Sequence, residues 1–187
     1  MDSYNTGVYT INTLYFHIFL RSSMNITPLW GNPFKKISPD IKDELKFLSS
    51  VPIFDSLSSR QLQKIHKLIH IREFVDGELI FRQGDPGVGM YIVRRGQVDV
   101  YKEYPDMNRA KITTMISGDF FGEISLLNDC TRSATIVSSK ESTLLGLFRP
   151  DLFGLMDSDP KLGLRLIYRI SQIVAERLRL STTNSGD

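Results

Sequence analysis

The stretch GDFFGEISLLNDCTRSAT at residues 118–135 combines the groups that a small phosphorylated ligand requires. Gly122 has no Cβ, so a ligand can approach the backbone closely there. Residues 123–127 predict one short helical turn, whose first N–H groups lack partners within the helix and attract an anion. Arg132 can grip two phosphate oxygens in a fork, while an ionised Glu123 only accepts hydrogen bonds and suits a sugar hydroxyl. The stretch therefore predicts a site for a ribose that carries a phosphate.

A plainer interpretation is open at this point, because a glutamate and an arginine nine positions apart are often a solvated ion pair that contributes little. Further blocks weigh against it. FGEISLL at 121–127 and RSAT at 132–135 are preceded, in order, by GELIF at 77–81, GD at 84–85, YIV at 91–93 and GQV at 96–98. Together these blocks resemble the cyclic nucleotide-binding domain family over about residues 47–180. Thr131 departs from the pattern, since many members have proline before the arginine, but both key side chains are in place.

The resemblance implies how a ligand is held. It implies that the cyclic phosphate meets Arg132 and main-chain groups of Ser125 and Ser133, and that Glu123 meets the ribose hydroxyl. The ligand-contacting residues expected in this way are Gly122, Glu123, Ile124, Ser125, Arg132, Ser133 and Ala134. The residues expected to wall the base and sugar are Leu79, Val93, Phe120, Leu127 and Ala134, although any of them could equally be plain core. Cyclic AMP is expected rather than cyclic GMP, because members selective for cyclic GMP often have threonine where this chain has Ser133.

Composition limits the remaining possibilities. A chain of 187 residues accommodates one domain with appendages, and its apolar content of 41% is ordinary for a soluble protein. A formal charge of +2 is too small to suggest a nucleic-acid surface. Cys130 is the single cysteine, so no disulfide can form within the chain, which fits a cytoplasmic location. A redox switch at Cys130 would need a lowered thiol pKa, and an incidental small residue is the preferred interpretation.

The two ends of the chain read as appendages. Residues 1–37 predict a poorly defined leader or arm, in which Trp30 and Phe34 could pack on the domain or on a partner. The apolar run at 14–20 is far shorter than the roughly 20 residues of a membrane helix, so no membrane span is expected. Met24 is a candidate for the true start. Residues 181–187 predict a flexible polar tail, which leaves no room for a helix-turn-helix after the last helix.

Two helices are expected within residues 38–70, at the beginning of a domain that spans 38–180. The first begins at Ser38-Pro39-Asp40 and presents Ile41, Leu45 and Leu48 as an apolar stripe. The second begins after Ser58, which has capping-box spacing to Gln61. His66 and His70 could bind a metal at their spacing of four, but no further ligand with suitable spacing is near. A pair at the boundary of an amphipathic helix, with no metal, is therefore the preferred interpretation.

Residues 71–148 contain short runs of β type separated by turn residues, which predicts a sandwich or barrel. Two of these runs, 90–94 and 97–102, flank Arg95-Gly96 and predict a hairpin, in which Val98-Asp99-Val100 alternates as a half-exposed strand. The full set of expected strands is 77–81, 90–94, 97–102, 111–116, 133–138 and 143–148. With the resemblance, the expected fold is mainly β with flanking α-helices, a jelly-roll-like β-roll or double-stranded β-helix that ends in a long C-terminal helix.

Residues 150–180 predict the C-terminal helices. A short helix at 150–156 is followed by a long one, which Asp159-Pro160 caps and which runs to about Leu180. Its apolar face comprises Leu162, Leu166, Ile170, Ile173 and Val174, and its polar stripe comprises Arg165, Arg169, Gln172, Glu176 and Arg179. Two readings of the apolar face are equally open: it covers its own domain, or it forms a homodimer through 160–180.

These expectations favour a regulatory domain that binds a cyclic nucleotide and shifts its C-terminal helices to control a protein partner that the sequence does not identify. Neither catalysis, a metal, a cofactor nor nucleic-acid binding is expected. The rival hypothesis is a scaffold domain that keeps the fold without the ligand. The presence of both Glu123 and Arg132 argues against that rival, because members that lose the ligand commonly lose one or both.

Overall fold

The computed structural model describes residues 41–105 and 108–183, with side chains described up to residue 180. The expected leader at 1–37, the start of the first helix at Ser38-Pro39-Asp40 and the last four residues of the expected tail lie outside these ranges.

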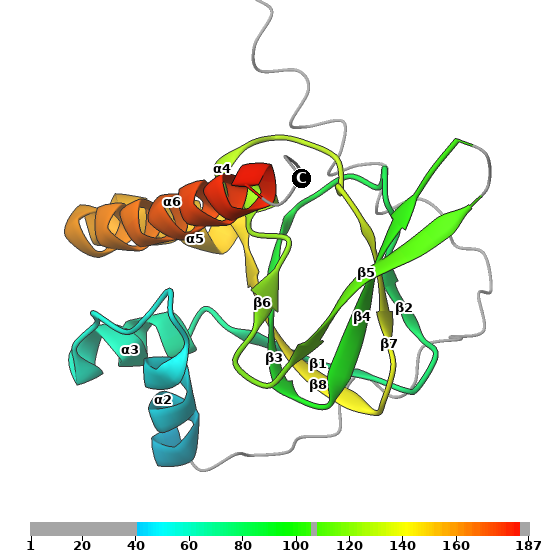
Figure 1. The fold of residues 1–187 in the computed structure, drawn as a ribbon. Helices are drawn as coiled ribbons and strands as arrows, with labels where there is room; N and C mark the ends of the chain where they lie inside the picture. Colours follow the sequence, from blue (N-terminus) through cyan, green and yellow to red (C-terminus); the bar gives the residue numbers. More distant parts are fainter. Residues whose placement is uncertain (1–40, 106–107, 184–187) are drawn as a thin grey trace, which may run out of the picture. The chain divides into compact units, whose positions relative to one another are not determined.

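Two four-stranded antiparallel sheets form the centre of the domain (Figure 1). The first has the order β1 (His70–Phe74), β8 (Ser142–Phe148), β3 (Gly89–Arg95), β6 (Phe120–Phe121). The second has the order β2 (Leu79–Phe81), β7 (Thr135–Ser138), β4 (Gln97–Glu103), β5 (Arg109–Ile116). The predicted β-roll with flanking helices is confirmed.

Strand β3, in the middle of the first sheet, is buried on both of its faces. Its side chains alternate across the sheet, as in any strand. Val93 faces the second sheet and joins an apolar cluster between the two sheets with Val98, Phe121 and Leu144. Met90 and Ile92 face the other way, toward the helices. The first sheet is therefore the partition between two cores.

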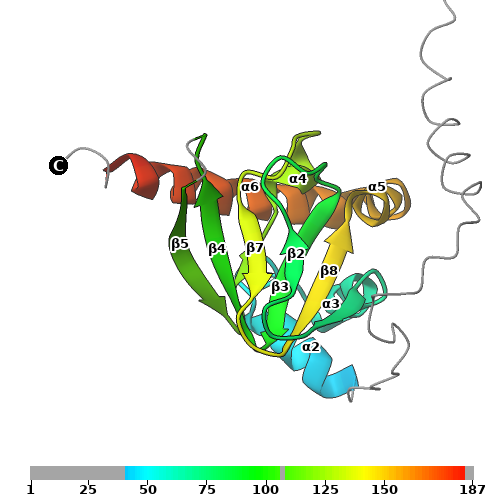
Figure 2. The ribbon, with the colours of Figure 1, turned by 90° about the vertical axis from the view of Figure 1, so that its right-hand side faces the viewer.

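The helices supply the second core. They are α2 (Ile41–Ser50), α3 (Ser59–His66), α4 (Ile124–Leu127), α5 (Arg149–Ser158) and α6 (Pro160–Thr183). Leu48, Phe54, Ile65, Leu152 and Leu162 pack with the helix-facing side chains of the first sheet. Helix α6 lies along the end of the roll where α4 is found, which both Figure 1 and Figure 2 show. The long helix is thereby brought beside the stretch that the sequence singled out.

Both helix starts predicted from capping residues and described here are confirmed. The Ser58 side chain accepts a hydrogen bond from the Gln61 N–H, and the Gln61 side chain accepts one from the Ser58 N–H. Asp159 Oδ1 accepts a hydrogen bond from the Leu162 N–H at 3.2 Å. Helix α6 continues to Thr183, three residues further than expected. None of the described helices has the length and apolarity needed to span a bilayer.

The predicted hairpin of residues 90–94 with 97–102 is wrong. Strand β3 belongs to the first sheet and β4 to the second, so the chain crosses between sheets at Gly96. Gly96 has a φ of 91°, and a Cβ there would lie 2.3 Å from Ser142 Oγ, so only glycine fits the crossing. The true hairpin joins β4 to β5, from Gln97 opposite Ile116 to Glu103 opposite Arg109.

Three smaller expectations also fail. Asp99 is 8% exposed rather than half-exposed, because Lys111, Thr114 and Tyr101 cover its face of the sheet with polar contacts. Ile41, expected to face inward, is 59% exposed at the start of α2. His70 does not share a helix with His66, since it begins β1 and contacts Asp151 at 3.0 Å.

Candidate functional site

The predicted site is built where two loops pack against each other. We call residues 122–134 the cassette. Its last part runs beside the glycine-rich loop at 84–89: the Arg132 N–H donates to Asp85 O at 2.8 Å, and the Gly84 N–H donates to Arg132 O at 2.9 Å. A Cβ on Gly87 would lie 2.0 Å from Ser125 Oγ. The glycine loop therefore serves as the support on which the cassette rests.

Arg132 is the centre of the cassette and is 5% exposed. Its Nη1 donates to Gly89 O at 2.6 Å, to Gly122 O at 3.3 Å and to Ser125 Oγ at 3.3 Å. The guanidinium lies over the Phe81 ring, 4.1 Å from its centroid. Burial lowers the pKa of Arg132, which nearby acidic groups partly offset. Within the described ranges it has no carboxylate partner at ion-pair distance, and its buried Nε has no hydrogen-bond partner.

Glu123 is also buried, at 7% exposed, but it is engaged by the long helix. Its Oε1 accepts a hydrogen bond from Arg177 Nη1 at 2.8 Å. Arg177 Nη2 donates to Phe120 O at 3.2 Å, and the guanidinium lies 4.3 Å from the Phe120 ring centroid. The carboxylate expected to meet a ribose hydroxyl is thus in contact with α6.

The remaining predicted ligand contacts all lie in the cassette, in different environments. Ser125 is buried with its hydroxyl toward Arg132, whereas Ile124 is 44% exposed. Ser133 is exposed, and its carbonyl accepts a hydrogen bond from Lys102 Nζ at 3.0 Å. Ala134 packs against the cluster between the sheets.

The predicted pocket-wall residues divide into two kinds. Val93 is fully buried between the sheets, and Phe120 is 2% exposed in the helix-side core, where its ring also carries Arg177. Leu79 and Leu127 are partly exposed at the edges of the roll. The structure therefore places these four residues in separate environments.

Three residues at the site were missed by sequence reasoning: Phe81, Arg149 and Arg177. Arg177 follows Ile173 and Val174 by four and three positions, so helical spacing could have placed it on the inner side of α6. Arg149 donates to Ser125 O at 2.6 Å and to Asn128 O at 2.7 Å. No local pattern marks Arg149, because its partners come from a loop more than twenty residues earlier in the chain.

An aromatic cluster lines the interior beside Arg132. Tyr91 packs against Phe81 and Phe121, with ring centroids 6.4 and 5.8 Å apart. Burial raises the pKa of the Tyr91 phenol, an effect that the positive charge of Arg132 opposes. The guanidinium is therefore buried beside an aromatic cluster, and burial strengthens its interaction with an anion because screening by water is reduced.

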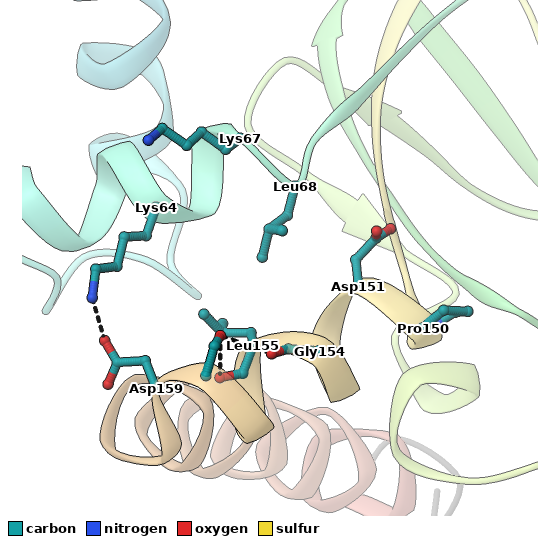
Figure 3. Close-up of a pocket in the computed structure, with 9 residues that line it drawn as sticks. Lys64, Lys67, Leu68, Pro150, Asp151, Gly154, Leu155 and Asp159 are labelled. Carbon is teal, nitrogen blue, oxygen red and sulfur yellow. Dashed lines mark hydrogen bonds and ion pairs between the residues drawn. The ribbon is translucent and has the colours of Figure 1, made fainter.

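A cavity of about 460 Å³ lies elsewhere, between α3 and α5 (Figure 3). Its apolar lining includes Leu68 and Leu155, and the ion pair of Lys64 with Asp159, at 2.7 Å, lies at one side of it (Figure 3). No cassette residue lines it. We assign the candidate site to the cassette, because Arg132 is buried there with an unpartnered Nε, whereas buried Glu44 and Asp99 have cationic partners. Among the described side chains, no cluster of three or more His, Cys, Asp or Glu could hold a metal ion.

Comparisons with known proteins identify the family to which most of the β-roll belongs. Residues 71–159 match the family described as the cyclic nucleotide-binding domain. This stretch belongs to the cyclic nucleotide-binding domain family. It runs from the second residue of β1 through α5 and contains the whole cassette, so the family resemblance inferred from the motif blocks is confirmed.

Among relatives of this domain, a putative potassium channel protein of Rhodopseudomonas palustris is 32% identical over 130 residues, which is 70% of this chain and 30% of the relative. A cAMP-dependent protein kinase regulatory subunit of Hypocrea atroviridis is 33% identical over 95 residues, 51% of this chain and 20% of the relative. The chain thus spans less than a third of either relative. The crystal structure of the Thermus thermophilus catabolite activator protein superposes with a TM-score of 0.65 at 28% identity, covering 71% of this chain and 61% of that one.

Proposed function

We propose that the domain is a regulatory sensor whose ligand is a cyclic nucleotide, with cyclic AMP preferred. The observation that carries the proposal is Arg132: a 95% buried cation that bonds only neutral oxygens and keeps an unpaired Nε. A buried charge without an opposite charge is costly unless a partner arrives. A singly charged phosphodiester supplies that partner, and hydrogen bonds to charged groups contribute about 1.5–3 kcal/mol each.

The proposed contacts are those that the family resemblance implies for the residues of the cassette. The cyclic phosphate meets Arg132 and main-chain groups of Ser125 and Ser133. Gly122, Ile124 and Ala134 complete the contact surface through their backbone, and Gly122 has no side chain to obstruct approach. Glu123 accepts the ribose hydroxyl.

The preference for cyclic AMP rests on the residue after Arg132, which is Ser133 rather than the threonine frequent in members selective for cyclic GMP. The names of relatives do not separate the two nucleotides: one relative, 33% identical over 95 residues, is named a cAMP-dependent protein kinase regulatory subunit, and another, 34% identical over 110 residues, is named a cGMP-dependent protein kinase.

Binding would be communicated through α6. Because Arg177 already engages Glu123, a ribose hydroxyl at this carboxylate must share it with α6 or displace the helix.

Helix α6 also has a second apolar face, formed by the exposed side chains of Leu164, Tyr168 and Leu178. We assign that face to the binding of a second copy of the chain or of another protein partner. Ligand binding would change how accessible the face is to that partner. This arrangement supports control of a partner as the output. The proposal includes no catalysis, no cofactor and no nucleic-acid binding. A cytoplasmic location, where a lone cysteine stays reduced, belongs to the same proposal.

Calorimetric titration with cyclic AMP and then cyclic GMP tests the proposal. We expect micromolar or tighter binding of cyclic AMP, and a loss of about tenfold or more in Arg132→Gln, because a charge-assisted contact disappears. Arg95→Gln is the matched control, since Arg95 is 71% exposed and pairs with Glu141 at 3.5 Å, outside the cassette. If folded wild-type protein gives neither heat nor a thermal shift with both nucleotides, the scaffold hypothesis replaces this one.

The output is tested separately. Amide exchange over residues 151–180 should change when nucleotide binds, and identical exchange in both states would contradict a signal through the helices. Sedimentation velocity of wild-type protein and Tyr168→Glu tests the homodimer. We expect a dimer that the charged substitution dissociates, whereas a wild-type monomer would assign the exposed face of α6 to another protein.

A further inference from the structure

Arg149 is the residue that ties the C-terminal helices to the cassette. It begins α5 directly after β8. Its Nε and Nη2 donate to Ser125 O at 3.0 and 2.6 Å, and Nη2 also donates to Asn128 O at 2.7 Å and Gly87 O at 3.3 Å. Nη1 pairs with Asp129 Oδ1 at 3.0 Å. One side chain thus spans the cassette and the glycine loop.

Helix α4 needs the contact with Arg149 because it is so short. A helix of four residues is far below the length at which a helix is stable by itself. Its last carbonyls have no partner inside the helix and carry partial negative charge. Arg149 supplies donors and a positive charge to this end, through Ser125 O and the carbonyl of the C-cap residue Asn128.

Ser125 is held from two sides as a result. Arg132 contacts its hydroxyl at 3.3 Å, while Arg149 contacts its carbonyl at 2.6 Å. Gly87 packs directly against the same side chain, since a Cβ on Gly87 would clash with Ser125 Oγ. The position of Ser125, and with it the N-terminal turn of α4, is therefore fixed by an arginine that lies on a different element.

We infer that Arg149 is a positioning residue for anion binding. It sets the geometry of the cassette by holding its backbone carbonyls and does not contact the ligand itself. The inference rests on the proposed function, which names the ligand. A planar fork is required, because the acceptors on Gly87, Ser125 and Asn128 surround one guanidinium. A lysine has a single ammonium on a flexible stem and cannot reproduce this set of bonds.

The test compares Arg149→Lys and Arg149→Gln with wild type, by cyclic AMP titration and by amide exchange without ligand. We expect both variants to bind about tenfold more weakly or worse, because several hydrogen bonds are lost together. Exchange should rise over residues 122–134 while the strands β3, β4 and β8 keep wild-type protection. Arg95→Gln serves as the control, since Arg95 is 71% exposed and pairs with Glu141, outside the cassette. Its affinity for cyclic AMP should stay within about twofold of wild type.

The outcomes separate the two proposals. If wild type binds and Arg149→Lys binds within about twofold of it, the fork is unnecessary and the inference is overturned. A general loss of protection across the β-roll would also overturn it, by showing a purely structural effect. If wild type binds no nucleotide, the proposed function fails by itself. Exchange in the cassette then still decides whether Arg149 positions it.

Discussion

At the scale of single residues, Gly122 is the position where backbone conformation and site chemistry coincide. Its φ is 77°, a conformation that costs a residue with a Cβ about 1–2 kcal/mol. A Cβ there would also lie 2.5 Å from Arg132 Nη1 and 3.1 Å from Gly89 O. A side chain at this position would therefore strain the turn and push the guanidinium out of its place.

Gly77 provides the comparison that separates these two effects. It has a φ of 79°, but a Cβ there meets nothing within 4 Å. We expect Gly77→Ala to lower the free energy of unfolding by about 1–2 kcal/mol in urea titrations, and Gly122→Ala to lower it further, because its methyl also overpacks against Arg132. Only Gly122→Ala should weaken nucleotide binding in calorimetry, because only it displaces Arg132. Equal nucleotide affinity in the two variants would contradict this account of Gly122.

At the scale of elements, the junction of α5 and α6 contains two helical glycines with opposite surroundings. A Cβ on Gly154 would meet nothing within 4 Å, whereas a Cβ on Gly163 would lie 2.6 Å from Met156 Cγ and 3.0 Å from Met156 Cα. Gly163 is thus the contact that allows α6 to pack closely on α5. Within the described structure, no close contact requires a glycine at position 154.

We expect Gly154→Ala to raise the free energy of unfolding by about 0.5–1 kcal/mol, because alanine has the higher helix propensity. Gly163→Ala should instead lower it by about 1–3 kcal/mol, since the added methyl overpacks the helix contact. Urea unfolding of the two variants measures both values. A stabilising Gly163→Ala would show that α6 can shift on α5 without cost.

The second sheet carries a buried carboxylate whose protonation should affect stability. Burial raises the pKa of Asp99, but hydrogen bonds from Lys111 and Thr114 outweigh that effect and hold it below its usual value. A depressed pKa in the folded state means that the stabilisation is present above the unfolded pKa, about 3.9, and is lost as pH falls through the folded pKa.

Asp99→Asn should therefore destabilise the domain more at pH 7 than at pH 3, as measured by urea unfolding at both values. Asp157→Asn, a substitution of an exposed aspartate on α5, serves as the control and should change stability little at either pH. A difference between wild type and Asp99→Asn that does not depend on pH would contradict a stabilising charge at Asp99.

At the scale of the whole domain, α6 links the helix-side core to the cassette. Its first half is anchored by Leu162, Leu166 and Ile170, all fully buried. Its second half is mostly exposed, and Arg177 contacts both Glu123 and Phe120 from there. The cassette therefore holds the end of α6 that has the least apolar anchoring.

Removing this contact should loosen one half of α6 only. In Arg177→Gln we expect faster amide exchange over residues 174–180 without ligand and unchanged exchange over residues 162–170, because local opening follows the number of buried contacts. The global free energy of unfolding should fall by no more than about 1 kcal/mol, since Arg177 is partly solvated. Unchanged exchange at 174–180 would show that α6 is held without Glu123.

The sequence alone determined the fold class and most of the strands, and it marked the candidate residues of the cassette, because these depend on local patterns. Glycines mark turns, alternating apolar residues mark strands, and the order of the motif blocks identified the family. Capping residues such as Ser58 and Asp159 likewise act on their immediate neighbours, so their helices could be predicted.

Tertiary structure decided what local patterns cannot contain. Whether β3 pairs with β4 depended on the crossing at Gly96, which places adjacent strands in different sheets. Arg149 and Arg177 reach the cassette from helices more than twenty and fifty residues away in the chain. Such contacts arise only when the packed core brings distant segments together. For that reason the sequence named the groups that could meet a phosphate, while the fold decided which other side chains hold them.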